Sequence, residues 1–332
     1  MTRPRIVVTN PVHPPVLELL RQEGEVVANP SPVPWTPAEL AARSADASAL
    51  MAFMPDRVDG EFLAGAPRLQ IVACALRGHD NFDVDACTRS GVWVSTVPEL
   101  LIAPTAELAI GLAIGLARNV RLADPVVRSG SHHGWRAAFY GSGLAGAVVG
   151  IVGMGKLGQA IAKRLGAFDC ARVLGVDPRP FAPEGAAPVS LKQALADADY
   201  LFLAAPLTQH TLALVDAKAL AHARAGQLII NVGRGSVVDE GAVADALFEG
   251  RLAGYASDVF AFEDWAVPGR PAGIDERLLS LPNTLFTPHL GSAVRDVRLQ
   301  IELCAAGNIV AALQGREPPD AINQPQAKVA QT

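Results

Sequence analysis

The residue that first suggests chemistry is an arginine at the end of an apolar run. The stretch LIINVGRGSVVDE, residues 228–240, is apolar up to Asn231 and then places Arg234 between two glycines. Glycine allows unusual backbone torsions and a close approach to a ligand. A guanidinium is a planar fork of donors that fits an oxyanion. We therefore expect Arg234 to bind an anionic substrate.

Three more polar residues lie at the ends of other apolar runs. Asp258 and His289 each close such a run, and Glu263 lies a few residues beyond Asp258. If the runs are parallel strands, their carboxyl ends meet at one edge of a sheet. A carboxylate beside a histidine orients the ring and stabilises its charged form, so His289 with Glu263 is a candidate acid or base. Taken alone, His289 could equally cap or pack beside the next helix. The matching positions of Arg234 and Glu263 favour catalysis.

A glycine motif supplies the cofactor prediction. In VVGIVGMGKLGQAIAKRL an apolar run leads into Gly153, Gly155 and Gly158 with GxGxxG spacing, and an amphipathic segment follows. These glycines permit the tight turn, the approach to a pyrophosphate and the close helix packing of a dinucleotide site. Asp177 closes the next run, where a carboxylate would hold the adenosine ribose. A tight turn without ligand is the alternative; the complete strand, turn, helix and acid context favours NAD.

The elements that must position these residues form two similar series. Short β-rich runs alternate with amphipathic segments, which is typical of parallel strands covered on both faces. We therefore predict an α/β fold of two doubly wound, Rossmann-like parallel-sheet domains. The first series of strands occupies residues 5–9, 25–28, 49–54, 70–75 and 92–96, and the second occupies 147–153, 172–177, 200–205, 227–233, 254–260 and 284–289.

Local signals add three expectations. Thr36, Pro37 and Glu39 have the types and spacing of a helix cap, a first-turn proline and a capping box. The proline-rich segment 179–188 should be a surface loop. Residues 316–332 should be mostly a loose tail.

Composition limits the kind of protein. The chain has 332 residues, of which 50% are hydrophobic and 18% are charged, so a well-buried globular protein is expected. A net charge of −5 argues against a nucleic-acid partner. The four scattered cysteines suit reduced thiols in the cytoplasm. The longest apolar stretch, residues 107–117, is too short to span a membrane, and His132 and His133 have no spaced partners for a metal.

The motifs GMGKLGQAIA, NVGRGSVVDE, DVF with a following Glu, and TPHLGS resemble the D-2-hydroxyacid dehydrogenases along nearly the whole chain. The resemblance implies catalytic roles for Arg234, Glu263 and His289. It implies a substrate domain of residues 1–100 and 290–332, a dinucleotide-binding domain of residues 101–289 and a long helix within 103–120 that connects them. It also implies a homodimer. The implied cofactor-binding residues are Thr105, Gly153, Gly155, Lys156, Leu157, Gly158, Asp177, Arg179, Pro206, Val232, Gly233 and Asp258.

Within that family the chain also resembles the phosphite (phosphonate) dehydrogenases, through LMAFMPDRVD, GHDNFDVDACTRSGVW, APTAELAIGL, the segment GW to FYGSGL, and TPHLGSAVRDVRLQIE. This implies substrate contacts by Met54, Arg77, Gly78, Trp135, Tyr140 and Ser292. It implies oxidation of phosphite to phosphate, with hydride leaving phosphorus for the nicotinamide while His289 deprotonates water. That group carries lysine where this chain has Arg77, so the charge is kept and the geometry changes.

Several alternatives stay open at the level of sequence. Met54 and Trp135 could be core residues, Tyr140 a buried phenol and Arg77 a surface residue. The substrate could instead be a small D-2-hydroxy acid, with glyoxylate or hydroxypyruvate as the oxo form. A dinucleotide-sensing co-regulator with the same fold is a third possibility. Because Arg179 follows Asp177 closely, NADP is expected as a weaker alternative to NAD.

Overall fold

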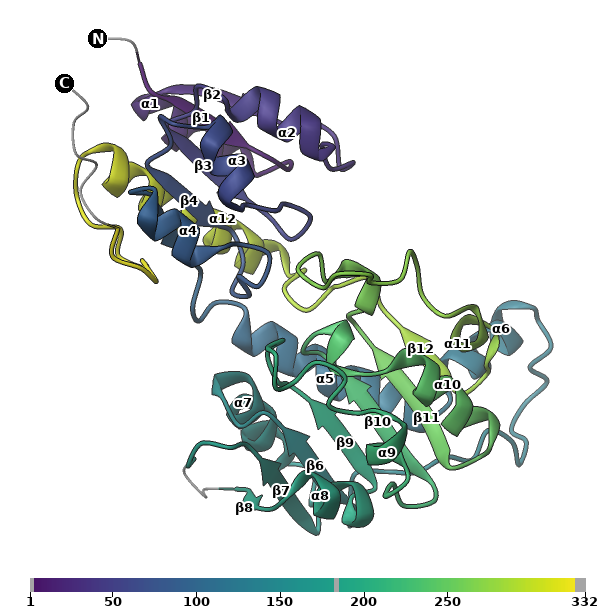
Figure 1. The fold of residues 1–332 in the computed structure, drawn as a ribbon. Helices are drawn as coiled ribbons and strands as arrows, with labels where there is room; N and C mark the ends of the chain where they lie inside the picture. The colour runs from purple at the N-terminus through teal and green to yellow at the C-terminus, as the bar shows by residue number, and fades with distance from the viewer. Residues whose placement is uncertain (1–2, 182–184, 326–332) are drawn as a thin grey trace. The chain divides into compact units, whose positions relative to one another are not determined.

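The computed structural model describes residues 3–181 and 185–325, and the chain divides into two compact units (Figure 1). The terminal unit is built from both chain ends, Met1–Leu101 and Ala293–Thr332. The central unit is Ile102–Ser292. The boundaries expected from the sequence lay near residues 100 and 290.

The terminal unit is organised around a five-stranded sheet in the order β2-β1-β3-β4-β5, in which every described strand pair is parallel. Non-consecutive neighbours require crossovers, which the helices provide. The strands are β1 (Arg5–Val8), β2 (Glu25–Ala28), β3 (Ala49–Ala52), β4 (Ile71–Cys74) and β5 (Trp93–Ser95), and the helices are α1 (Pro14–Glu23), α2 (Pro37–Ser44), α3 (Gly60–Gly65), α4 (Val84–Arg89) and α12 (Arg295–Leu313).

Both faces of this sheet are covered, which explains why its strands are almost wholly apolar. Met51 and its same-face neighbours pack under α1 and α12, and Leu50 with the opposite face packs under α2, α3 and α4. Because successive strand residues point to opposite faces, both sets are buried. The helix α12 therefore brings the C-terminal part of the chain onto the sheet made by the N-terminal part.

The central unit has a seven-stranded sheet in the order β12-β11-β10-β9-β6-β7-β8, again parallel at every described pair. The predicted fold class, two doubly wound parallel-sheet units, is confirmed. The strands are β6 (Val148–Val152), β7 (Arg172–Val176), β8 (Ala187–Pro188), β9 (Tyr200–Leu203), β10 (Gln227–Asn231), β11 (Leu252–Ser257) and β12 (Thr284–Phe286).

Helices again cover the two faces of the central sheet. The helices α5 (Ile102–Ala117) and α7 (Lys156–Leu165) bury one face, and α8 (Leu191–Asp197), α9 (Ala217–Leu220), α10 (Glu240–Phe248) and α11 (Glu276–Ser280) bury the other. The remaining helix, α6 (Val120–Arg128), joins neither core cluster. The strand order reverses at β6, and such a reversal is where doubly wound sheets bind their ligands.

Two local predictions were tested directly. Thr36 caps α2 and forms the capping box with Glu39, as the sequence indicated. The segment 179–188 is not only loop, since Ala187 and Pro188 form β8 beside β7; residues 182–184 lie outside the described residues.

The prediction of a loose tail was wrong for its described part. The Ile322 amide donates to the Val94 carbonyl at 2.8 Å, and the Asn323 side chain accepts from the Val94 amide at 2.8 Å. Asp320 accepts from Asn308 of α12 at 2.9 Å. The open edge of β5 offers unpaired backbone groups, and the tail satisfies them. The rest of the predicted tail, 326–332, lies outside the described residues.

Asp56 is a buried carboxyl at the carboxyl edge of the terminal sheet. Asp56 is 3% exposed and accepts hydrogen bonds from the Phe53 amide at 2.7 Å and from the Thr9 hydroxyl. Burial raises the pKa of Asp56 to about 6, against hydrogen bonds that act to lower it. Asp56 thereby closes the turn that follows β3 and joins it to the end of β1.

We expect Asp56 to make stability depend on pH. Its pKa in the folded protein, about 6, lies above the ordinary value of 3.8. The folded state therefore gains stability below about pH 4 and loses it as the pH rises through about 6, by at most about 3 kcal/mol. Relative to Asp56→Asn, the wild type should become less stable over this range, measured by urea unfolding. A constant difference would contradict this, and Glu25→Gln, an exposed carboxyl of the same unit, is the control.

Candidate functional site

The turn between β6 and α7 has the shape of a dinucleotide cradle. Gly153 has φ of +93°, and a Cβ there would lie 2.6 Å from the Ala205 amide nitrogen. A Cβ on Gly158 would lie 2.0 Å from the Gly153 carbonyl oxygen. Both positions exclude any other residue. Gly155 precedes the first turn of α7, and a Cβ there would meet no atom within 4 Å, so the space beside this glycine at the helix start is open to a phosphate.

The end of β7 supplies the carboxylate that the motif requires. Asp177 accepts from the Met154 amide at 2.9 Å and from the Arg179 amide and guanidinium at 2.9 and 3.2 Å. Burial acts to raise the pKa of Asp177, but the hydrogen bonds from Arg179 and Met154 outweigh it and hold this pKa below its ordinary value. Asp177 is thus an ionised acceptor beside the glycine turn. The residues present fit an NAD site.

The other predicted cofactor residues lie near this turn or elsewhere at the carboxyl edge of the central sheet. The Val232 amide donates to Leu203 at 3.1 Å, and a Cβ on Gly233 would come within 2.6 Å of the Ala205 carbonyl oxygen. Thr105, in the first turn of α5, lies against Gly291. Lys156 and Leu157 begin α7, and Pro206 follows β9. Their contacts with a cofactor stay predictions.

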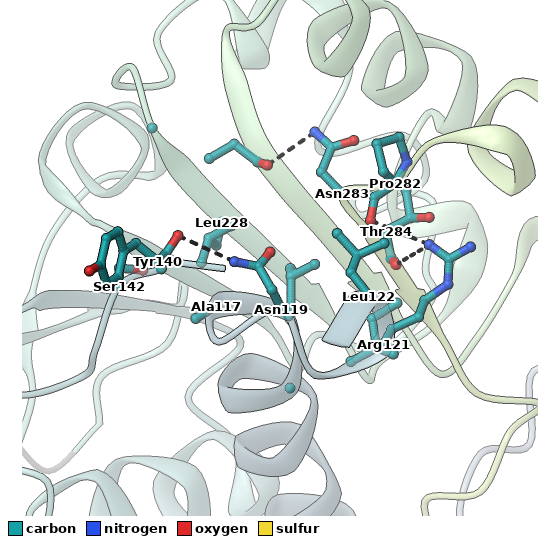
Figure 2. Close-up of a pocket in the computed structure, with 16 residues that line it drawn as sticks. Ala117, Asn119, Arg121, Leu122, Tyr140, Ser142, Leu228, Pro282, Asn283 and Thr284 are labelled. Carbon is teal, nitrogen blue, oxygen red and sulfur yellow. Dashed lines mark hydrogen bonds between the residues drawn. The ribbon is translucent and has the colours of Figure 1, made fainter. Parts of the chain in front are cut away.

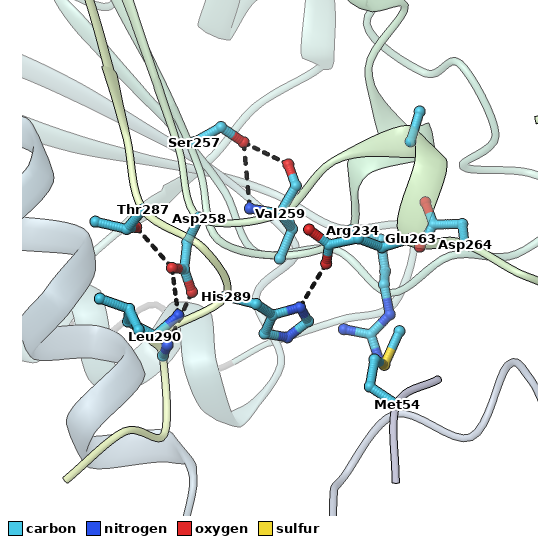
Figure 3. Close-up of polar contacts among 12 residues, drawn as sticks. Met54, Arg234, Ser257, Asp258, Val259, Glu263, Asp264, Thr287, His289 and Leu290 are labelled. Carbon is cyan, nitrogen blue, oxygen red and sulfur yellow. Dashed lines mark hydrogen bonds and ion pairs between the residues drawn. The ribbon is translucent and has the colours of Figure 1, made fainter. Parts of the chain in front are cut away.

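The Asp258 carboxylate is used by the protein itself. It accepts from the Thr287 hydroxyl and the Leu290 amide, both at 2.6 Å, and from the Gly291 amide at 2.8 Å (Figure 3). Burial raises the pKa of Asp258 in spite of these hydrogen bonds. These bonds fix the loop that carries His289. The sequence assigns Asp258 to the cofactor; in the structure this carboxylate shapes the site, and its contact with a cofactor stays a prediction.

His289 and Glu263 form the expected pair. The His289 Nδ1 lies 2.6 Å from the Glu263 Oε2, which leaves Nε2 turned away from the carboxylate (Figure 3). Glu263 belongs to the short 3-10 helix η2 (Ala261–Glu263) that follows β11. His289 has φ of +57°, an uncommon backbone conformation for a residue with a side chain. A hydrogen bond from the His289 amide to the Asp258 carbonyl, 2.9 Å long, holds this conformation. The fixed ring can exchange a proton through Nε2 while Glu263 stabilises its charged form.

Arg234 lies between the end of β10 and the 3-10 helix η1 (Gly235–Val237). One guanidinium nitrogen donates to the Gly233 carbonyl at 3.0 Å, and Asn231 donates to the Arg234 carbonyl at 2.9 Å. Arg234, Glu263 and His289 thus follow three neighbouring strands, β10, β11 and β12, of one sheet (Figure 3). The structure confirms that the strand ends bring a cation, a carboxylate and an imidazole to one edge.

Three predicted substrate residues lie at the carboxyl edge of the terminal sheet. Met54 follows β3, and its carbonyl accepts from Asn81 at 2.8 Å. Arg77 and Gly78 follow β4, and both are half-buried, which argues against Arg77 as a fully solvated surface residue. Burial lowers the pKa of Arg77, and the charge of Glu99 partly counters this. Ser292, also half-buried, is the last residue of the central unit.

Two predicted substrate residues lie elsewhere. Trp135 and Tyr140 are 80% and 78% exposed, so the alternatives that they are core residues are wrong. Tyr140 lines a cavity of about 300 Å³ with Arg121 and Asn283, at the amino-terminal ends of β10 to β12 (Figure 2). This is the opposite edge from Arg234 and His289. Within one chain Tyr140 does not join that cluster, and substrate contacts by Trp135 and Tyr140 stay predictions.

Some polar residues near these edges were not predicted from the sequence as part of a site. Arg298 of α12 donates to the Ala75 carbonyl at 3.4 Å and pairs with the buried Glu302 at 3.5 Å. Asp264, next to Glu263, is only 1% exposed. In the sequence each resembles a solvated charge on a helix or loop, and only their burial distinguishes them.

Among the described residues, no group of three or more His, Cys, Asp or Glu side chains could hold a metal ion. No helix within residues 3–181 and 185–325 has both the length and the apolar character needed to cross a membrane.

Comparison with known proteins agrees with this geometry. Residues 110–291 match the NAD-binding domain of D-isomer specific 2-hydroxyacid dehydrogenases. The chain is 37% identical over 341 residues to a glyoxylate reductase of Aeropyrum pernix, covering 100% of this chain and 99% of the relative. A glyoxylate reductase of Pyrococcus furiosus is 33% identical over 338 residues, covering 98% and 97%.

Solved structures extend the comparison to the fold. The TT0316 protein of Thermus thermophilus has a TM-score of 0.87 at 34% identity, covering 96% of this chain and 100% of that one. An NADPH-dependent glyoxylate/hydroxypyruvate reductase of Sinorhizobium meliloti, in complex with NADP and malonate, has a TM-score of 0.84 at 30% identity, covering 97% of both chains. The chain therefore belongs to the D-isomer specific 2-hydroxyacid dehydrogenase family and is an NAD-dependent oxidoreductase of that family.

Proposed function

We propose that the protein is a glyoxylate reductase type of D-2-hydroxyacid dehydrogenase, which interconverts a small 2-oxo acid and its D-2-hydroxy acid. The observation that carries this proposal is the 2.6 Å contact of His289 with Glu263 on the sheet edge that also bears Arg234. An imidazole held by a carboxylate can protonate a carbonyl oxygen, and a guanidinium can hold a carboxylate. The glyoxylate reductases among its relatives support the same substrate class.

The roles of the residues follow from their chemistry. Arg234 binds the substrate carboxylate and orients the adjacent carbonyl. A bound nicotinamide would supply the hydride to the carbonyl carbon. His289 donates its Nε2 proton to the carbonyl oxygen, so that the C=O bond becomes a CH–OH group. Glu263 stabilises the imidazolium before the transfer and orients the ring throughout, and Asp258 holds the loop on which the ring is carried.

Phosphite oxidation is the second candidate. It rests on the resemblance to phosphite dehydrogenases of segments outside the cofactor motif and on the half-buried residue Arg77. A tetrahedral oxyanion would use the Arg234 fork as a carboxylate does, and His289 would then remove a proton from water instead of donating one. The comparisons favour the 2-oxo acid, because the two relatives above are glyoxylate reductases.

A side-by-side assay separates the two candidates. We expect NADH oxidation with glyoxylate or hydroxypyruvate to have a higher kcat/KM than NAD reduction with phosphite. His289→Asn should lower the maximal rate with the preferred substrate by roughly two to four orders of magnitude, because it removes the proton donor. The exposed His222, replaced by Asn, is the matched control. Phosphite turnover alone would overturn the first candidate, and near-normal turnover by His289→Asn would remove that residue from the chemistry.

Cofactor choice follows from the pair Asp177 and Arg179. The Asp177 carboxylate should accept from the ribose hydroxyls of NAD and repel the 2′-phosphate of NADP, so NAD should be preferred. Asp177→Ala removes the repulsion and frees the Arg179 guanidinium now bound to it, so relative efficiency with NADP should rise about tenfold or more. The double variant Asp177→Ala with Arg179→Ala should lose much of this gain. An unchanged NAD to NADP ratio in Asp177→Ala would place Asp177 away from the ribose.

We also propose that the protein is a homodimer through α6 and residues 129–143. Within the described chain α6 buries none of its side chains, and Val127 is 61% exposed. Trp135 and Tyr140, in the segment that follows α6, are also exposed apolar side chains. In sedimentation experiments the wild type should be a dimer, and Val127→Asp with Trp135→Ser should weaken it, whereas Phe248→Ser, an exposed apolar residue of α10, should not. A monomeric wild type would refute the proposal.

A further inference from the structure

We propose that two buried carboxylates, Asp264 and Glu240, are positioning residues. They fix the Arg234 loop, residues 232–240, relative to the Glu263 segment, residues 260–264. This inference rests on the proposed function, because it concerns how Arg234 is kept in a fixed position relative to the acid–base pair of His289 and Glu263. Neither side chain belongs to the catalytic set identified from the sequence. Both belong to the central unit, and each belongs to one of the two segments that must be aligned.

Asp264 holds the Arg234 loop from the side of the acid–base pair. It follows Glu263 directly in the chain and is 1% exposed. Its Oδ2 accepts the Ser236 amide at 2.7 Å, and Ser236 lies two residues after Arg234. A hydrogen bond of this length to a charged acceptor is strong, and the site is shielded from water. Asp264, the residue next to Glu263, is thus hydrogen-bonded to the backbone two residues after Arg234.

Glu240 makes the reciprocal contact. It begins α10, the helix that follows the Arg234 loop, and is 7% exposed. Its Oε1 accepts the Ala261 amide at 2.9 Å, and Ala261 lies two residues before Glu263. Each segment therefore donates one backbone amide to a buried carboxylate of the other. Two such bonds in opposite directions resist both sliding and separation of the segments.

The backbones of the two segments are in direct contact between these bonds. A Cβ on Gly235 would lie 1.8 Å from the Phe260 carbonyl carbon and 2.1 Å from the Ala261 nitrogen. Only glycine permits that approach. The contact sets how close the segments come, and the two carboxylates hold them there. Arg234 and Glu263 each lie within two residues of these contacts.

This arrangement matters because the reaction is sensitive to small displacements. A misplacement of about 1 Å can lower a rate by on the order of a hundredfold. Burying two carboxylates is costly, and burial does raise the pKa of Glu240. A fold that needed only a hydrophobic contact here would not require them. We therefore expect their loss to change catalysis more than folding.

The test compares three variants of Asp264. Asp264→Ala removes the acceptor and should lower kcat/KM for glyoxylate by about thirty- to a hundredfold. Asp264→Asn keeps an acceptor oxygen at the same place and should stay within about threefold of wild type. Asp264→Glu keeps the charge but displaces the oxygen by one methylene, and should resemble the alanine variant. In each variant the Kd for NADH, followed by fluorescence, should stay within about twofold, because the glycine turn is not altered.

A control at another carboxylate separates positioning from a general loss of stability. Asp199 also accepts an amide from another segment, Val148 at 2.8 Å, but at the amino-terminal edge of the central sheet. Asp199→Ala should lower the melting temperature without lowering kcat/KM. Equal activity losses in Asp199→Ala and Asp264→Ala, or equal losses in Asp264→Asn and Asp264→Ala, would overturn the inference. If Asp264→Ala does not fold, Asp264→Glu decides.

The inference can fail separately from the proposed function. If the wild type reduces neither glyoxylate nor hydroxypyruvate, the proposed function fails. Calorimetric binding of oxalate, a small dianion, to the NADH-loaded protein then reports on Arg234 without turnover. Asp264→Ala should weaken oxalate binding about tenfold or more, and Asp264→Asn should not. Oxalate affinity equal in wild type and Asp264→Ala would overturn the positioning role.

Discussion

The hydrogen bond between His289 and Glu263 depends on one geometric fact, that neighbouring parallel strands end at the same edge of a sheet. Glu263 follows β11, His289 follows β12, and Arg234 follows β10. The strands themselves carry no catalytic side chain in this account. They are rigid, buried on both faces, and they deliver three loops to a common edge. The 2.6 Å contact is possible because these loops are then fixed to one another by hydrogen bonds.

The loops are fixed by buried polar groups, and burying such groups costs desolvation free energy. Asp258 binds the His289 loop through three donors, and Asp264 and Glu240 connect the other two loops. Burying a carboxylate costs desolvation free energy, which hydrogen bonds to it offset. Here the donors are mainly backbone amides of the loops that carry the reacting groups. The cost of burial is thus offset by bonds that also set the geometry of the site.

The sequence was sufficient for the features that have a short repeat or a fixed spacing. Apolar runs predicted the strands, and the GxGxxG spacing with Asp177 predicted the turn, because a Cβ at Gly153 or Gly158 would clash with neighbouring backbone. The order Arg234, Glu263, His289 could be placed at one edge once the strands were known. Contacts between distant segments could not be predicted. Nothing in the spacing of Asp264 shows that it accepts from Ser236, and nothing near Trp135 shows that this side chain is exposed.

The most direct test of the acid–base pair is the pH dependence of glyoxylate reduction in wild type and Glu263→Gln. Glutamine keeps the shape of the side chain and removes the charge that favours the protonated imidazole. Because His289 must carry a proton to donate one, the alkaline fall in kcat/KM should move to lower pH in the variant. The maximal rate should also fall. Superimposable pH–rate profiles for the two proteins would contradict the role given to Glu263, and with it the account of this site.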